Sequence, residues 1–135
     1  MTSQFDKTAL VQYRLEQAKN TLHDAHVLFE QGGTPVSIVN RAYYAIFYAT
    51  MALIGALKEN VDTSKHEGVI AAFNREFIKT GVLPKGLSKI LREAFEARQE
   101  GDYRDLSAII DRDKASEILF SADQFVNSIE MHLSR

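Results

Sequence analysis

Val36-Ser-Ile-Val-Asn-Arg-Ala-Tyr-Tyr-Ala-Ile-Phe-Tyr-Ala-Thr-Met-Ala-Leu-Ile-Gly-Ala-Leu57 is the stretch that decides the fold, because a helix with this sequence is apolar on nearly every side. Such a helix belongs at the centre of a helical bundle or in a membrane. Its only charged residue is Arg41, whose guanidinium would cost about 2.5–3.5 kcal/mol near the middle of a bilayer. We therefore predict the central helix of a bundle. Arg41 must then be satisfied by neighbouring groups or face a cleft that admits an anion.

Amphipathic helices are predicted on both sides of this central stretch. The preceding helix has apolar residues at alternating gaps of four and three, and Gly32-Gly33 ends it. Thr34 and Pro35 supply a capping residue and a proline for the first position of the central helix. The first two helices should therefore form an antiparallel hairpin. The apolar positions of the first helix are Val11, Leu15, Ala18, Leu22, Ala25 and Phe29.

Three further helices are predicted after the central one. Ser64 and Glu67 have the spacing of a capping box, and the helix they open should end at Gly81. A fourth helix is predicted over about 86–100, and Asp111 is placed to cap the last one. We predict an all-α, up-and-down bundle of about five helices, forming one domain over residues 1–135.

Composition restricts where function can reside. The 135 residues carry a net charge of −2, which gives no overall attraction for nucleic acid, so an anion site must be local. The absence of cysteine excludes disulfides and thiolate chemistry. The first seven residues lack the basic-then-apolar order of a secretory signal, and we expect a cytoplasmic protein.

A polar stripe on the central helix is the best candidate site. Ser37, Arg41, Tyr44 and Tyr48 follow gaps of four, three and four, which place them on one helix face, with Asn40 at its rim. A guanidinium surrounded by neutral donors suits a phosphate. The alternative is a structural network, since buried Tyr and Arg also bond to helix carbonyls or carboxylates.

Four segments together resemble the HEPN domain family, in particular its stand-alone prokaryotic proteins. They are residues 40–49, 65–70, 77–81 and 97–103, and the resemblance covers about residues 8–133. It implies a homodimer whose paired second helices line a cleft. In active members of toxin–antitoxin and defence systems, that cleft cuts RNA without a metal or other cofactor.

The catalytic signature of this family is an arginine followed, after four to six residues, by a histidine. Arg41 matches the arginine, but Tyr48 aligns best with the histidine. A tyrosine stays protonated at pH 7 and is a poor general base, although it can donate to a phosphate. His66 could supply the base instead; the alternative is a surface or capping histidine.

Several other polar residues have both a functional and a structural interpretation. Asp102, with Tyr103, is predicted to be architectural, with Asp102 as the ion-pair partner of Arg41, while Arg98 could join Arg41 at an anion site. Although His23 and His26 lie three residues apart, no acidic ligand pattern accompanies them, and no metal site is predicted. A basic strip is either an RNA-facing surface or solvated charge. It consists of Lys79, Lys85, Lys89 and Arg92.

The sequence leaves two main functions open. The first is an RNA-directed toxin or defence ribonuclease that uses Arg41 and Tyr48, with assistance from His66. The second is a non-catalytic module that binds RNA or a nucleotide, or docks a minimal nucleotidyltransferase. A third possibility is that such a nucleotidyltransferase modifies Tyr48 or Tyr103.

Overall fold

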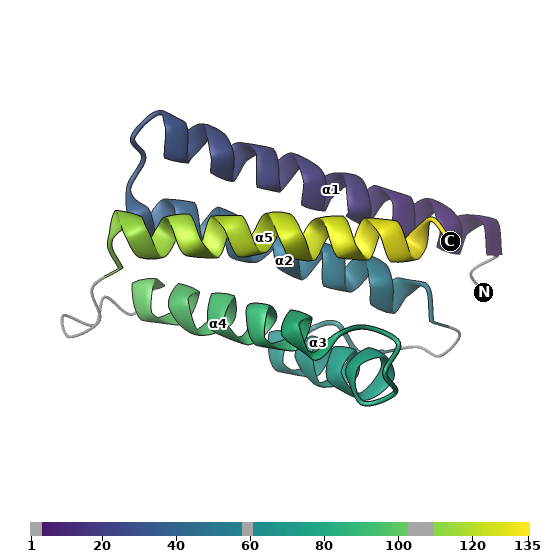
Figure 1. The fold of residues 1–135 in the computed structure, drawn as a ribbon. Helices are drawn as coiled ribbons and strands as arrows, with labels where there is room; N and C mark the ends of the chain where they lie inside the picture. Colours follow the sequence, from purple (N-terminus) through teal and green to yellow (C-terminus); the bar gives the residue numbers. More distant parts are fainter. Residues whose placement is uncertain (1–3, 58–60, 103–109) are drawn as a thin grey trace.

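Five α-helices and one short π-helical turn make up the described part of the chain (Figure 1). This computed structural model describes the backbone of residues 4–57, 61–102 and 110–135, and within them no strand occurs. The all-α prediction and the predicted number of helices are confirmed. The elements are α1 (Gln4–Glu30), α2 (Pro35–Gly55), α3 (His66–Phe73), the π-helical turn η1 (Asn74–Ile78), α4 (Lys85–Asp102) and α5 (Arg112–Leu133).

Helix α2 is the axis of the bundle. It packs against α1, α3, α4 and α5, and Figure 1 shows it passing behind α5, with α1 above and α4 below. Tyr43 and Ile46 are fully buried, and Leu53 is 1% exposed. Because burying one such side chain contributes about 1.5–3 kcal/mol, this helix supplies much of the stability of the fold. None of the described helices is long and apolar enough to cross a membrane.

The helix ends follow local signals that the sequence carries. Gly32 adopts a φ of 76° just after α1, a left-handed conformation that side chains other than glycine rarely adopt. The Thr34 hydroxyl accepts a hydrogen bond from the backbone N–H of Ser37 and caps α2, with Pro35 at its first position. Asp111 caps α5 in the same way, by accepting from the N–H of Lys114 at 2.8 Å. These three predicted boundaries are confirmed.

The predicted capping box at the start of α3 is wrong. Lys65 occupies the capping position and makes no side-chain cap bond. Ser64 instead donates its backbone N–H to the Asp62 carboxylate at 2.9 Å, and hydrogen bonds from the side chain and the backbone of Ser64 lower the pKa of Asp62. The physical reason is competition between two short polar residues. The Asp62 carboxylate closes a local turn by bonding to Ser64, and Ser64 is then not placed to cap the helix.

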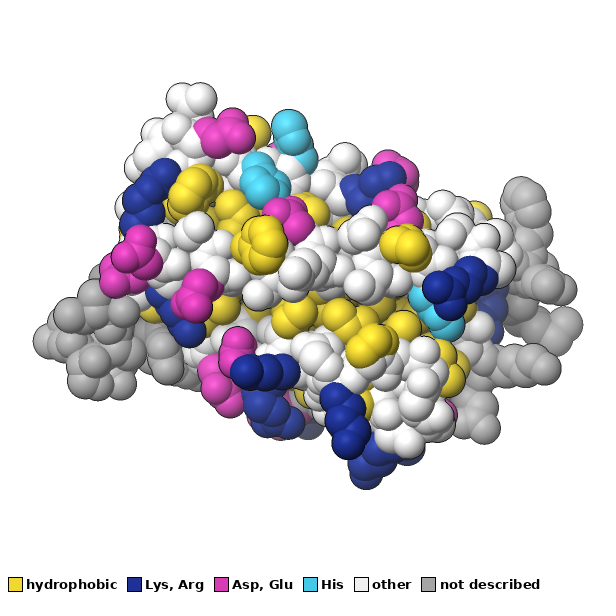
Figure 2. Space-filling model, in the orientation of Figure 1, with side chains coloured by type: hydrophobic (Ala, Val, Ile, Leu, Met, Phe, Trp, Pro, Cys, Tyr) yellow, Lys and Arg dark blue, Asp and Glu magenta, His cyan; other side chains and the backbone are white. Residues whose placement is uncertain are grey.

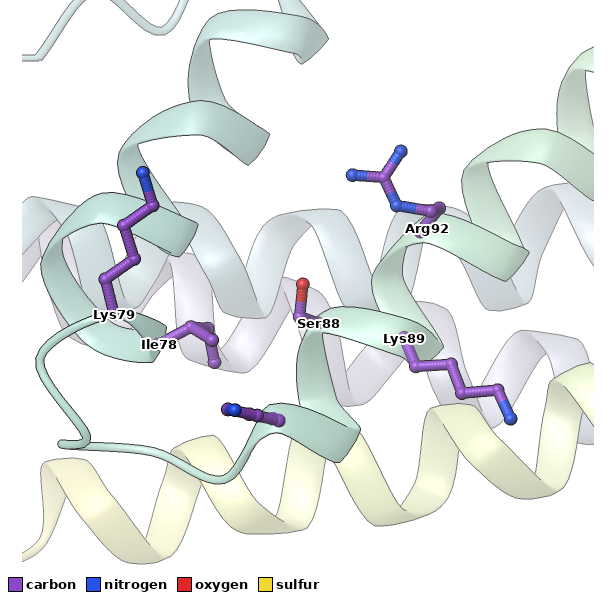
Figure 3. A pocket seen from close by; sticks show the side chains of 6 residues that line it. Ile78, Lys79, Ser88, Lys89 and Arg92 are labelled. Atoms are coloured by element: carbon purple, nitrogen blue, oxygen red, sulfur yellow. The ribbon is translucent and has the colours of Figure 1, made fainter.

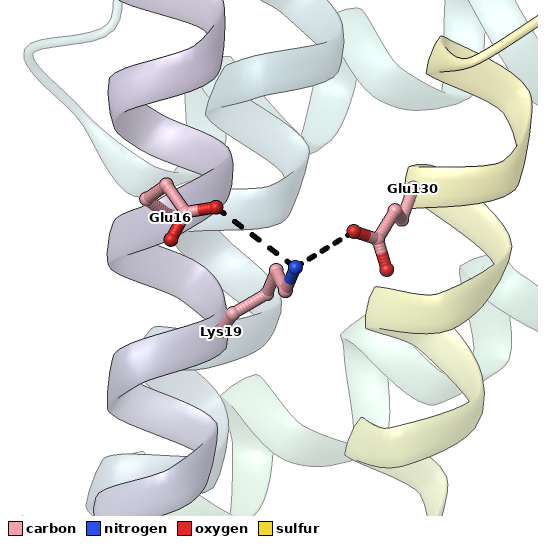
Figure 4. A network of polar contacts seen from close by, with 3 residues as sticks. All are labelled: Glu16, Lys19 and Glu130. Atoms are coloured by element: carbon pink, nitrogen blue, oxygen red, sulfur yellow. Dashed lines mark hydrogen bonds and ion pairs between the residues drawn. The ribbon is translucent and has the colours of Figure 1, made fainter.

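Helices α1 and α5 are joined at the surface by polar contacts. Lys19 donates to Glu130 at 2.9 Å and lies 3.9 Å from Glu16 (Figure 4). Their hydrogen bond and negative charges raise the pKa of Lys19. His26 bonds to Asp123 at 2.7 Å further along the same pair of helices. Exposed pairs of this kind contribute little, so the buried stripes beneath them hold the two helices together.

Candidate functional site

The ring of Tyr44 is the centre of the candidate site. Arg41, one turn earlier on α2, places its guanidinium carbon 5.4 Å from the ring centroid. Arg98, near the end of α4, places its own at 5.2 Å. Two guanidinium groups therefore lie against one aromatic ring. The two guanidinium carbons can be no farther apart than the sum of their distances from the Tyr44 ring centroid. Cations above aromatic rings are attracted by the ring quadrupole, and here one ring holds two of them.

Arg41 keeps its positive charge uncompensated among the side chains that the structure describes. Its Nε and Nη2 atoms donate to the Asn40 side-chain oxygen at 3.2 and 2.9 Å. Within those side chains, no carboxylate pairs with it. Because the amide of Asn40 is neutral, the bond orients the half-buried guanidinium without cancelling its charge. An anionic ligand would supply the compensating negative charge that the described neighbours of Arg41 lack.

His66 enters the site from the first turn of α3. Its Nδ1 atom lies 2.6 Å from the hydroxyl of Tyr43, and its ring stacks on Phe47 at a centroid distance of 4.1 Å. The same ring meets Tyr44 edge-on at 5.9 Å. Arg41, Arg98 and His66 thus all surround Tyr44. This brings together two cations and one group able to move a proton.

Burial sets the protonation states of the Tyr43–His66 pair. It raises the pKa of Tyr43 well above its usual value, outweighing the opposing positive charge of Arg98. It also lowers the pKa of His66 below its usual 6.5, and Arg98 lowers it further. Both groups are consequently uncharged at pH 7. A neutral imidazole can accept a proton, which an imidazolium cannot.

Tyr48 continues the stripe on α2. Its ring lies 5.8 Å from that of Tyr44, and it is half-buried. None of the described residues is hydrogen-bonded to its hydroxyl. The Tyr48 hydroxyl is therefore available to donate to a bound anion. It lies one turn beyond Tyr44 on the same face of α2.

The structure brings most of the sequence-predicted site residues together, but not all of them. Asn40, Arg41, Tyr44, Tyr48, His66 and Arg98 meet around one ring system. Ser37 is exposed in the first turn of α2, and its hydroxyl accepts a bond from Thr34 at 2.8 Å. The side chain of Asp102 and the whole of Tyr103 lie outside the described residues.

The histidines of α1 have a different setting. His23 is exposed, and His26 is bonded to Asp123. In the part of the chain that the structure describes, there is no group of three or more His, Cys, Asp and Glu side chains that could hold a metal ion.

Sequence reasoning missed Tyr43 and Phe47 as site residues and placed Tyr43 on another side of the helix. One signal was present: a tyrosine hydroxyl on a helix buried all round needs a hydrogen-bond partner. That signal names no partner, because His66 is 23 residues away in the chain. Only the packing of α3 on α2 brings the two together.

Comparison with known proteins places this architecture in a family. The sequence matches the HEPN domain over residues 11–132. It is 38% identical over 125 residues to the "UPF0332 protein" of Thermotoga maritima, covering 93% of this chain and 92% of that protein. It is 32% identical to the "Putative toxin MJ0142" of Methanocaldococcus jannaschii, covering 88% of this chain and 78% of that protein. A second protein of that organism, "Putative toxin MJ0605", is 32% identical, covering 91% and 88% of the two chains. With a match along nearly its whole length and an all-α bundle around one buried helix, the chain belongs to the HEPN domain family.

Proposed function

We propose that this protein acts on RNA as a toxin-type HEPN protein and binds a phosphate of its target between Arg41 and Arg98. The observation that carries the proposal is the Tyr44 ring, against which both guanidinium groups lie at 5.4 and 5.2 Å. The family membership and the relatives named as toxins support the same direction. A phosphodiester between the two guanidiniums would receive forked hydrogen bonds, and Tyr48 could add a neutral one.

We further propose that His66 takes the proton-transfer role that Tyr48 cannot perform. In the reaction, an imidazole nitrogen accepts the proton of the ribose 2′-hydroxyl, and the 2′-oxygen forms a bond to phosphorus. The bond from phosphorus to the 5′-oxygen then breaks, and that oxygen leaves after taking a proton from water. Arg41 and Arg98 would stabilise the extra negative charge that builds up on phosphorus oxygens in between.

The contact with Tyr43 decides which nitrogen of His66 is available. A tyrosine hydroxyl both donates and accepts, so it can support either tautomer of the neutral ring. When Nδ1 carries the hydrogen and donates to Tyr43, Nε2 keeps a lone pair and can act as the base. When Tyr43 donates to Nδ1, Nε2 carries the hydrogen and has no lone pair with which to accept a proton, so this tautomer cannot act as the base at Nε2. Tyr43 is therefore a positioning residue in this proposal.

Cleavage assays on purified protein test the proposal. Wild type should cut total RNA or transfer RNA without added metal, and His66→Gln should lower the rate by about 10²–10⁴-fold, the usual contribution of a general acid or base. Arg41→Ala should weaken both binding and cleavage. The matched control is His26→Gln, because His26 is also a partly exposed, hydrogen-bonded histidine but lies on α1 against α5. Its rate should equal that of wild type.

The pH profile separates a base from a structural histidine. Since the pKa of His66 lies below 6.5, its neutral form dominates from pH 7 upward, and the rate should be flat there and fall on acidification. RNA left intact by wild type, or cut equally well by His66→Gln, would remove the catalytic part of the proposal.

Tyr48 favours a second candidate, a non-catalytic module. The histidine position of the family signature holds a tyrosine, and binding of RNA or a nucleotide at Arg41 and Arg98 does not require a base. Such a module would work as a homodimer or dock a minimal nucleotidyltransferase. Calorimetry with nucleotides and RNA, light scattering, and co-expression followed by intact-mass measurement test it. An added nucleotidyl mass that disappears in Tyr48→Phe would support modification of Tyr48, whereas no affinity and no partner would argue against the module.

A further inference from the structure

A basic groove lies apart from the Tyr44 site, between the end of η1 and the first turns of α4. Its volume is about 610 Å³, and it is lined by Ile78, Lys79, Lys85, Ser88, Lys89 and Arg92. Figure 3 shows the side chains of Lys79 and Arg92 on either side of Ser88, with Lys89 extending away from it. The four cations are those of the basic strip in the sequence, and the fold brings the two ends of that strip to one hollow.

The walls of the groove are held in place before any ligand arrives. Ser88 of α4 donates its hydroxyl to Asn74 of η1 at 2.6 Å. In the turn between the walls, the N–H of Leu83 donates to the carbonyl of Phe77 at 2.8 Å, and both side chains are buried. Gly81 adopts a φ of 78° in the same turn, which closes it tightly. A preformed site loses little conformational entropy on binding.

The charge of the groove is of one sign. None of the described residues that line it is acidic, and four of the six are cationic. Lys89 lies 3.8 Å from Glu93, but both are exposed, so this pair neutralises little. Figure 2 shows Lys and Arg side chains along the edge formed by α4, with Asp and Glu side chains beside some of them, and both signs also occur over α1 and α5. Like charges kept this close favour a ligand that is an anion.

We propose that this groove binds the sugar–phosphate backbone of single-stranded RNA, beside the phosphate held between Arg41 and Arg98. The proposal rests on the proposed function and adds a second contact to it. Lys85, Lys89 and Arg92 lie on one face of α4 over about 10 Å, which is longer than one phosphate and suits a strand. Arg98 follows Arg92 by six residues, about 9 Å along the axis of the same helix and about 120° around it. An RNA strand held at the first site would therefore have to pass partly around α4 to place its flanking nucleotides in the groove.

Salt-dependent RNA binding tests the groove. The variant Lys79→Gln/Arg92→Gln removes the two cations that flank Ser88. The matched control, Lys19→Gln/Lys114→Gln, removes the same charge from α1 and α5. Fluorescence anisotropy with labelled single-stranded RNA gives the slope of log K against log salt. Loss of two phosphate contacts should reduce that slope by about 1.4, from about 0.7 per contact, and weaken binding. Lys89→Gln should have a smaller effect than either flanking residue.

The control should keep the wild-type slope, and thermal melts should be unchanged in all these variants because the substituted side chains lie at or near the surface. Equal slopes for the groove variant and the control, with wild type binding RNA, would overturn the groove proposal while leaving the proposed function in place. Conversely, a groove-dependent slope together with unchanged binding and cleavage in Arg41→Ala and His66→Gln would retain the groove and overturn the Tyr44 site. Complete displacement of RNA by equimolar tripolyphosphate would identify a small-anion site and overturn the strand assignment.

Discussion

Replacing Tyr43 with phenylalanine isolates the contact that orients His66. The substitution keeps the fully buried ring and its packing on Phe47, and removes only the hydroxyl that lies 2.6 Å from Nδ1 of His66. Nothing else described in the structure bonds to that hydroxyl, so the change acts on one hydrogen bond.

The expected loss of stability follows from two contributions. A typical hydrogen bond contributes about 0.5–1.5 kcal/mol net, and an acceptor left without its partner in a buried place costs about 1–3 kcal/mol. Because His66 is only partly buried, water can replace some of what is lost, and we expect Tyr43→Phe to cost about 1–2 kcal/mol. For a chain of this length, with about 2.1 cal/mol/K of unfolding entropy per residue, that corresponds to a Tm lower by about 4–7 °C.

Thermal melts followed by circular dichroism measure this loss. Tyr48→Phe is the matched control: it deletes the same atom from the same helix, but the Tyr48 hydroxyl has no hydrogen-bond partner among the described residues. Its Tm should change by less than about 2 °C. A double-mutant cycle with His66→Phe, which keeps an aromatic ring on Phe47, should show a coupling of about 1 kcal/mol between positions 43 and 66.

Two results would refute this reasoning. Equal Tm shifts for Tyr43→Phe and Tyr48→Phe would mean that the bond to His66 adds nothing beyond loss of a hydroxyl. Additivity of the Tyr43→Phe and His66→Phe changes to within about 0.3 kcal/mol would mean that the two side chains do not interact in solution.

Three further predictions concern other parts of the chain. The pKa of His66 is lower in the folded protein than its usual 6.5, so below pH 6.5 the unfolded chain binds more protons than the folded one. The free energy of unfolding should therefore fall as the pH drops below 6.5. Chemical denaturation at a series of pH values should show a smaller loss in His66→Gln. Thr34→Ala removes a helix cap and should cost about 1 kcal/mol in the same assay, whereas Ser64→Ala should be nearly neutral, and a reversed order would restore the capping box. Gly81→Ala should cost about 1–2 kcal/mol because of its left-handed backbone, whereas Gly86→Ala, in open space within α4, should stabilise by about 0.5–1 kcal/mol; equal melts for the two would contradict this assignment.

The helices were predictable because their signals are local. The gaps of three and four between apolar residues on α1 recur in the structure, where Val11, Leu15, Ala18 and Ala25 are buried. Thr34 and Asp111 cap their helices by contacts within three residues, which sequence spacing specifies directly. The capping box failed at Ser64, where a second local acceptor, Asp62, lies two residues away. The third helix, predicted to end at Gly81, instead ends at Phe73 and continues as the π-helical turn η1.

Only the part of the candidate site that lies on α2 was predictable from the sequence. Arg41, Tyr44 and Tyr48 share a helix face by their spacing, so their proximity needed no tertiary knowledge. Arg98 and His66 were named from the sequence, but neither could be placed beside Tyr44, because they arrive from α4 and α3. Tyr43 was assigned elsewhere, since helical projection cannot show which neighbouring helix covers each side.

The sequence by itself therefore determined the all-α bundle, its buried central helix and the lone guanidinium that had to be accounted for. The tertiary structure alone decided that this guanidinium shares a ring with Arg98, that His66 bonds to Tyr43, and that Lys79 and Arg92 face one hollow. The physical reason is the character of α2. A helix that is apolar on nearly every side carries no pattern to tell its neighbours apart, so the packing of the whole bundle selects which side chains meet.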